Sequence, residues 1–159
     1  MASKGKIVLG VAGVVTGVSA AIFIGIKIRN SSVDKKLEQI LGGGVGQYGD
    51  LKDMPGFKGK VYRDGLASNL NIIKLKDEVA RNYADNIDKA WGVLNDDEPA
   101  VYSVFNNIKD NYALSQVASV YEVIYKVPLL TKLEDKLSSD EQNEVYKIVR
   151  LYKPYRIAS

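Results

Sequence analysis

The 159-residue chain contains no cysteine and no histidine. The lack of cysteine excludes disulfides and thiolate chemistry. The lack of histidine removes the commonest general base and the commonest zinc ligand, so serine–histidine triads and histidine-dependent metal sites are excluded. The formal net charge of +3 is too small to argue for a nucleic-acid partner by itself. We therefore expect a non-enzymatic protein, with no catalytic residues and no resident metal or cofactor.

A long apolar run lies near the beginning of the chain. Residues 7–26 contain no charged residue and no proline. At about 1.5 Å of rise per residue, twenty helical residues span the roughly 30 Å hydrocarbon core of a bilayer. A domain of this size rarely hides a helix that is apolar on every face, and the apolar region of a signal peptide is shorter, about 7–15 residues. The sequence therefore predicts a transmembrane anchor over residues 1–29.

Basic side chains flank this run on both sides. The four nearest are Lys4, Lys6, Lys27 and Arg29. When Lys35 and Lys36 are also counted, the positive-inside rule leans towards a cytoplasmic location for the rest of the chain, although by a margin of only two side chains. We expect a single-pass protein of a virion membrane or of a bacterial inner membrane, and the side on which its soluble part lies stays open.

Small residues recur at every fourth position within the apolar run. They are Gly13, Gly17, Ala21 and Gly25. Because lipid provides no hydrophobic force between helices, association there depends on close backbone approach, which small residues permit. The stripe predicts packing against another transmembrane helix, either of a second copy or of another protein.

Two segments connect the predicted anchor to the rest of the chain. Val33, Leu37, Ile40 and Leu41 share one helical face, which predicts a short juxtamembrane helix over residues 30–41. Glycines and turn residues then dominate residues 42–68, which predicts a linker or loosely ordered arm. The glycine run is not followed by the lysine and hydroxyl residue of a phosphate-binding loop.

Apolar residues at helical spacing predict five short helices over residues 69–150. The markers are Ile72 to Trp91, Val101 to Ile108, Val117 to Tyr125, Pro128 to Leu137, and Val145 to Val149. Acidic clusters precede the second and fifth helices. Because carboxylates stabilise helix amino termini, we interpret Asp96, Asp97, Glu98, Asp140 and Glu141 as capping residues and not as catalytic groups. The predicted fold class is all-α.

Several short motifs occur in a fixed order within this helical region. They are Asp96-Asp97-Glu98 with Ala100-Val101, then Val117, Tyr121 and Tyr125, then Leu129-Leu130 with Leu133, and Lys136-Leu137-Ser138-Ser139-Asp140. In this order they resemble a single annexin repeat, and the resemblance covers roughly residues 70–150. It implies a five-helix annexin-like bundle.

The calcium site of that family is degenerate in this sequence. The family's glycine-containing loop reads Val93-Leu94-Asn95-Asp96 here, and Lys136 takes the place of the acidic ligand. A lysine puts a cation where calcium needs carboxylate oxygen. A calcium- or lipid-regulated membrane binder is therefore the weakest functional alternative.

The last segment, residues 151–159, mixes basic and aromatic side chains. Pro154 is expected to stop the preceding helix and to leave an extended tail. Such a tail suits docking on a protein, stacking on single-stranded nucleic acid, or contact with a membrane interface. The candidates for partner docking are Tyr152, Lys153, Tyr155 and Arg156.

The order of anchor, arm and helical domain predicts a function in attachment. We expect a tether that joins a protein assembly to a lipid bilayer, such as a minor virion protein that joins the capsid to the internal membrane of a phage. The partners would be capsid, shell or envelope subunits, and other copies through the transmembrane helix. The alternatives are a holin-like pore former and a cell-envelope factor that binds peptidoglycan.

Overall fold

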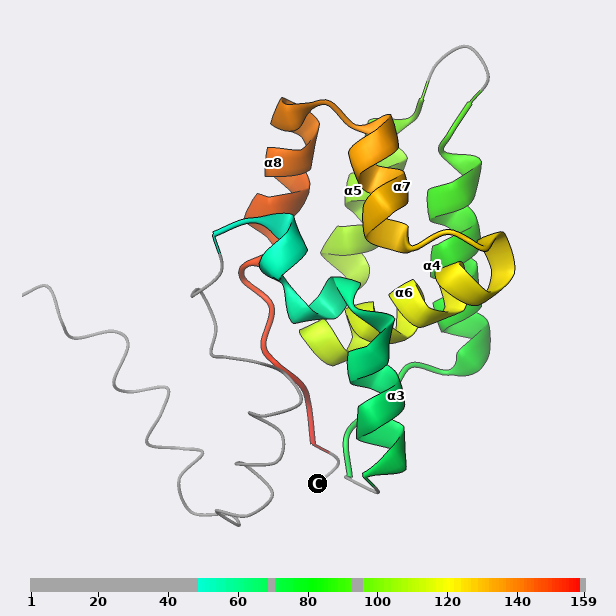
Figure 1. Cartoon of the computed structure of the whole chain (residues 1–159), viewed down its shortest axis with the longest axis vertical. Helices are drawn as coiled ribbons and strands as arrows, with labels where there is room; N and C mark the ends of the chain where they lie inside the picture. The colour runs from blue at the N-terminus through cyan, green and yellow to red at the C-terminus, as the bar shows by residue number, and fades with distance from the viewer. Residues whose placement is uncertain (1–48, 69–70, 93–95, 158–159) are drawn as a thin grey trace, which may run out of the picture. The chain divides into compact units, whose positions relative to one another are not determined.

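The computed structural model describes residues 49–68, 71–92 and 96–157 (Figure 1). These residues form six α-helices, two short 3-10 helices and no β-strand. The elements are η1 (Leu51–Asp53), η2 (Pro55–Phe57), α3 (Gly59–Ala67), α4 (Asp77–Lys89), α5 (Glu98–Asn107), α6 (Asn111–Tyr125), α7 (Leu129–Lys136) and α8 (Ser139–Val149). The predicted all-α class is confirmed for this part of the chain.

The predicted anchor and juxtamembrane helix lie outside the described residues. This applies to the stripe of Gly13, Gly17, Ala21 and Gly25 and to the flanking Lys4, Lys6, Lys27 and Arg29. Within the described ranges, no helix has the length and hydropathy that crossing a bilayer requires.

Helix α6 is the central element of the helical domain. Ten of its fifteen residues are buried, including every residue from Asn111 to Ser119. Such burial on all faces requires neighbours all around, and η2, α3, α4 and α7 pack against it (Figure 1). Helices α5 and α8 pack against each other, and α5 also contacts α4.

The apolar core joins helices α4 to α8. Its largest fully buried side chains include Phe105 of α5, Tyr121 of α6 and Leu133 of α7. Phe57 of η2 completes an edge-to-face pair with Phe105, with ring centroids 5.9 Å apart. The five helices predicted from apolar spacing are all present, in the predicted order.

Two of these helices begin elsewhere than expected. The first starts at Asp77, because the preceding residues are extended and Ile72 pairs with Ile157 in an antiparallel bridge. The third starts earlier, at Asn111, because the buried Asp110 caps it and accepts a hydrogen bond from the Ala113 amide at 2.7 Å.

The predicted caps are confirmed at the starts of α5 and α8. The side chain of Asp97 accepts from the Ala100 amide at 3.1 Å. Ser138 and Glu141 form a reciprocal capping box, in which each side chain binds the backbone amide of the other residue. These bonds satisfy amide groups that have no partner within the helix itself.

The part of the expected loose arm that the structure describes is folded. Residues 51–67 form η1, η2 and α3, and they bury Leu51, Met54, Phe57 and Val61. The glycines of α3 serve close packing: a β-carbon on Gly59 would lie 2.9 Å from the α-carbon of Ser119. The turn-forming composition of this segment therefore reflects tight contact with α6.

Candidate functional site

The segment that follows α8 binds the beginning of α6. Tyr152 is buried, and its hydroxyl donates to the carbonyl oxygen of Phe105. Burial, aided by the nearby charge of Asp110, raises the pKa of Tyr152, so the hydroxyl remains a donor at neutral pH. This tyrosine therefore fixes the start of the segment to the core.

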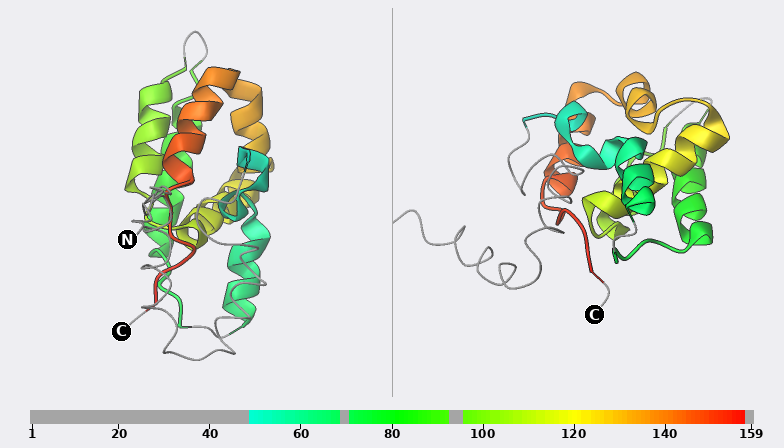
Figure 2. Two further views of the ribbon diagram at one scale, coloured as in Figure 1. Left: turned by 90° about the vertical axis from the view of Figure 1, so that its left-hand side faces the viewer. Right: turned by 60° about the horizontal axis from the view of Figure 1, so that its bottom comes forward.

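Backbone hydrogen bonds continue this attachment. The amides of Asn111 and Tyr112 donate to the carbonyl oxygens of Lys153 and Pro154 at 2.9 and 3.1 Å. The first amides of a helix have no partner within the helix, so the tail satisfies two of them. On the other side, the Ile73 amide donates to the carbonyl oxygen of Arg156 at 2.8 Å. Figure 2 shows the tail in red, running on from α8.

An ion pair closes the same contact. The Asp110 side chain is fully buried, and its carboxylate lies 2.5 Å from Nε of Arg156, whose side chain is 34% exposed. Since a buried carboxylate is costly without a cation, Arg156 neutralises the charge that caps α6. We call this contact the tail junction. It comprises Ile73, Asp110, Asn111, Tyr112 and residues 152–157.

The structure thus locates all four residues predicted to dock a partner. Tyr152 and Arg156 make contacts within their own chain, and Tyr155 packs against the small cluster of Val61 and Tyr112. Lys153 presents an exposed side chain. The sequence did not reveal the buried Asp110; the available signal was an aspartate immediately before the helix.

A row of buried polar side chains marks one face of α6. The Ser115 hydroxyl accepts from the Tyr62 amide at 2.9 Å and donates to the Lys58 carbonyl oxygen at 2.6 Å. Gln116 accepts from the Leu75 amide at 2.8 Å and donates to the Leu75 carbonyl oxygen at 3.0 Å. We call Ser115, Gln116 and Ser119 the polar face of α6.

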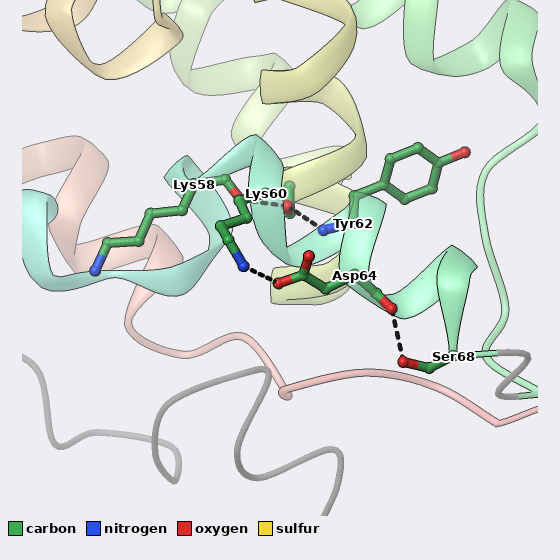
Figure 3. A network of polar contacts seen from close by, with 6 residues as sticks. Lys58, Lys60, Tyr62, Asp64 and Ser68 are labelled. Carbon is green, nitrogen blue, oxygen red and sulfur yellow. Dashed lines mark hydrogen bonds and ion pairs between the residues drawn. The ribbon is translucent and has the colours of Figure 1, made fainter.

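Figure 3 shows the α3 side of the polar face. Lys60 and Asp64 form an ion pair one turn apart at 2.5 Å, and the Ser68 hydroxyl donates to the Asp64 carbonyl oxygen at 2.7 Å. Arg63 extends from the same helix to Ser119 of α6, with Nη1 and Oγ 3.2 Å apart. The polar face therefore serves to hold α3 and residues 71–76 in place.

A groove of about 360 Å³ lies between α4 and α5. Its lining combines small or apolar residues with amides, a hydroxyl and two opposite charges. The residues are Tyr83, Asn86, Lys89, Ala90, Asp97, Ala100, Ser103, Val104 and Asn107. Asn86, Lys89 and Ser103 are exposed, so their donors and acceptors are accessible from solvent. This groove can receive a polar chain that needs both donors and acceptors.

Two tyrosine–aspartate hydrogen bonds connect α6 to α4. The Tyr121 hydroxyl donates to Asp88 at 3.0 Å and the Tyr125 hydroxyl donates to Asp85 at 2.8 Å. Burial and the bond to Asp85 raise the pKa of Tyr125 to about 12, and burial and Asp88 also raise the pKa of Tyr121. Both hydroxyls therefore remain protonated donors at neutral pH.

Acidic side chains gather where α5 and α8 meet. Burial, followed by the charges of Glu141, Glu98 and Glu144, raises the pKa of Tyr102. Within the described ranges, however, no three acidic side chains are placed to hold a metal ion. Glu141 belongs to the capping box of α8, and Glu144 pairs with Lys147 at 2.5 Å.

Comparison with protein-family models, curated proteins and solved structures finds no match to this chain. The predicted annexin-like repeat over residues 70–150 is therefore wrong. The matched positions were mainly leucines and valines of short amphipathic helices, a pattern that any small helical core requires. The structure also adds α3 to the five predicted helices, packed directly on α6.

Proposed function

We propose that this chain is a non-enzymatic single-pass membrane protein that tethers a protein assembly to a bilayer. Residues 7–26 would provide the anchor, and the helical domain from residue 49 onward would hold the partner. The observation that carries the proposal is the uncharged run of twenty residues, all apolar except Thr16 and Ser19, ahead of a packed helical domain.

The distribution of charge supports this division of roles. Residues 1–48 contain six basic and two acidic side chains, whereas residues 49–159 contain sixteen and seventeen. Positive charge beside an anchor favours contact with anionic lipid headgroups. The nearly neutral helical domain has no comparable attraction to a membrane or to nucleic acid, so contact with protein suits it better.

The use of the buried polar groups also supports a binding role. Asp110, Ser115 and Gln116 are all engaged in holding other segments of the chain. A catalytic group must reach a substrate, and these side chains instead stabilise the scaffold. We therefore assign the interior of the domain to structure and look for the partner on its surface.

The groove between α4 and α5 is the surface that we propose for the partner. Asn86, Ser103 and Asn107 offer amide and hydroxyl groups, and Lys89 and Asp97 add one charge of each sign. An extended protein segment exposes both backbone donors and backbone acceptors, so a mixed rim of this kind can pair with it. Ala90 and Ala100 are small enough to leave room for such a segment.

The test is a mild-detergent pull-down of the full-length protein from its native source, with mass spectrometry of the bound proteins. We expect capsid, shell or envelope subunits in stoichiometric amounts. Ser103→Trp, which fills the groove from an exposed position, should remove them. Asn143→Trp, at an exposed position of α8, is the matched control and should retain them. Recovery of a clean monomer contradicts the proposal.

A second function rests on the small-residue stripe of the predicted anchor. In a holin-like protein, Gly13, Gly17, Ala21 and Gly25 would form the contact face of an oligomeric pore. Expression alone would then depolarise the host membrane, and Gly17→Leu would abolish the effect. A pull-down that recovers homo-oligomers and no other protein favours this alternative over the tether.

A further inference from the structure

The tail junction has the features of a slot for an extended peptide. Three amides of the domain, those of Ile73, Asn111 and Tyr112, donate to carbonyl oxygens of the tail. Isolated bridges flank these bonds, parallel between Asp110 and Lys153 and antiparallel between Ile72 and Ile157. Main-chain pairing of this kind, combined with pockets for particular side chains, is how many domains bind extended peptides.

The slot also selects particular side chains. Tyr152 enters the core and reaches the carbonyl oxygen of Phe105, whereas Arg156 pairs with the fully buried Asp110. Withdrawal of the tail would give up this ion pair and the three backbone hydrogen bonds. A segment with the same spacing of tyrosine and arginine can restore all of these contacts.

The connection between α8 and the slot is short and exposed. Arg150 and Leu151 form a turn after α8, and Leu151 is 71% exposed, more than any other large hydrophobic residue in the described ranges. Opening this turn would free the tail without removing any other element from the core. Every contact of the tail could then be remade in an identical slot of a neighbouring chain.

We infer that the tail is exchanged between copies of this chain, so that residues 152–157 of one copy fill the tail junction of another. Exchange of an identical element is a low-cost route to association, because the contacts made equal those given up. A second copy is the occupant that the geometry favours, since it carries the sequence that the slot binds. Attachment to a membrane would promote exchange by raising local concentration, but the inference does not depend on the proposed function.

The antiparallel bridge provides a specific test. Because the Ile73 amide binds the Arg156 carbonyl oxygen, Ile72 and Ile157 face each other as a non-hydrogen-bonded pair. The α-carbons of such a pair lie about 4.5 Å apart. This separation lies within the range that a disulfide bridges. Since the chain contains no cysteine, introduced thiols have no competing partner.

Two full-length chains with different tags would be produced together in a membrane, one with Ile72→Cys and the other with Ile157→Cys. After extraction in mild detergent and gentle oxidation, exchange predicts a disulfide-linked heterodimer that carries both tags. A single chain with both substitutions, oxidised at high dilution, fixes the yield expected for a filled slot. If no heterodimer forms while this double variant links within the chain, the inference is wrong.

Two controls separate exchange from simple proximity. A chain with Asn143→Cys, at an exposed position in the middle of α8, should link to the Ile157→Cys chain at least tenfold less than the Ile72→Cys chain does. Equal yields would show random collision, or contact through the anchors alone, and would overturn the inference. Arg156→Ala in the Ile157→Cys chain should lower the heterodimer yield several-fold, because it removes the partner of Asp110.

These outcomes are independent of the tethering test. The disulfide can form in a preparation that contains no other protein, and a shell protein can be captured by a chain whose tail stays in its own slot. Failure of one experiment therefore leaves the other proposal standing.

Discussion

Helix α6 is held by two kinds of contact on its different faces. Val117, Ala118 and Tyr121 belong to the apolar core that α4, α5, α7 and α8 share. The polar face instead binds α3 and residues 71–76 through hydrogen bonds of Ser115 and Gln116. Apolar burial is non-directional and tolerant of small shifts, whereas hydrogen bonds and close glycine contacts require a particular geometry. The two faces should therefore respond differently to substitution.

The largest expected effect is on the apolar side. Leu133→Ala removes a fully buried side chain of α7 and should lower the free energy of unfolding by about 2–5 kcal/mol. Urea unfolding of the full-length protein in mild detergent, followed by the fluorescence of the single tryptophan Trp91, measures the change. Leu130→Ala, at a partly buried position of the same helix, is the control and should cost less. Equal losses would contradict a core centred on α6.

On the polar side, Gln116→Met is expected to act locally. Methionine keeps most of the side-chain volume but leaves the amide and carbonyl of Leu75 without their partner, which should cost about 1–3 kcal/mol. Hydrogen exchange measured by mass spectrometry should show loss of protection in residues 71–76, while α7 and α8 remain protected. Uniform loss of protection would mean that the two faces form one cooperative contact.

The close contact of α3 can be tested at Gly59. A β-carbon there would lie 2.9 Å from the backbone of Ser119, so Gly59→Ala must displace α3 and should cost about 1–3 kcal/mol. Gly49→Ala is a matched control, because its nearest neighbour, an Asp53 oxygen, would lie 4.0 Å away. Unchanged stability of the Gly59 variant would show that α3 can separate from α6 without cost.

The comparison also explains what the sequence predicted and what it did not. Helices α4 to α8 contribute apolar stripes to a common core, so their existence and order followed from apolar spacing. Helix α3 offers few apolar residues and two glycines, Gly59 and Gly65, which normally indicate a turn. Its attachment depends on polar residues of α6 that, in a sequence, are typical of a solvated surface. Buried polar contacts of this kind depend on the tertiary structure and leave no periodic signal.

The same reasoning applies to the candidate site. The aromatic and basic tail was predicted to dock on a partner, whereas the structure shows its contacts with its own chain at the tail junction. The ion-pair partner of Asp110 could not be predicted, because Arg156 lies 46 residues away in the sequence. The α4–α5 groove could not be predicted from the sequence either. The residues of its rim are ones that each helix would expose to solvent on its own.

The smallest expected effect concerns Tyr125, which packs against the apolar core one turn after Tyr121. Burial and the hydrogen bond to Asp85 raise its pKa from 10.0 to about 12, because the protonated hydroxyl is the form that donates. The stability that comes from this protonated hydroxyl is therefore complete below pH 10 and is lost as the pH rises towards 12.

Tyr125→Phe should cost about 1 kcal/mol at pH 8. The difference in urea midpoint between the two proteins should then shrink between pH 10 and pH 12. Groups that titrate in this range and do not contact Tyr125 are present in both proteins and cancel in the difference. A difference that stays constant up to pH 12 would show that the bond to Asp85 contributes nothing to folding.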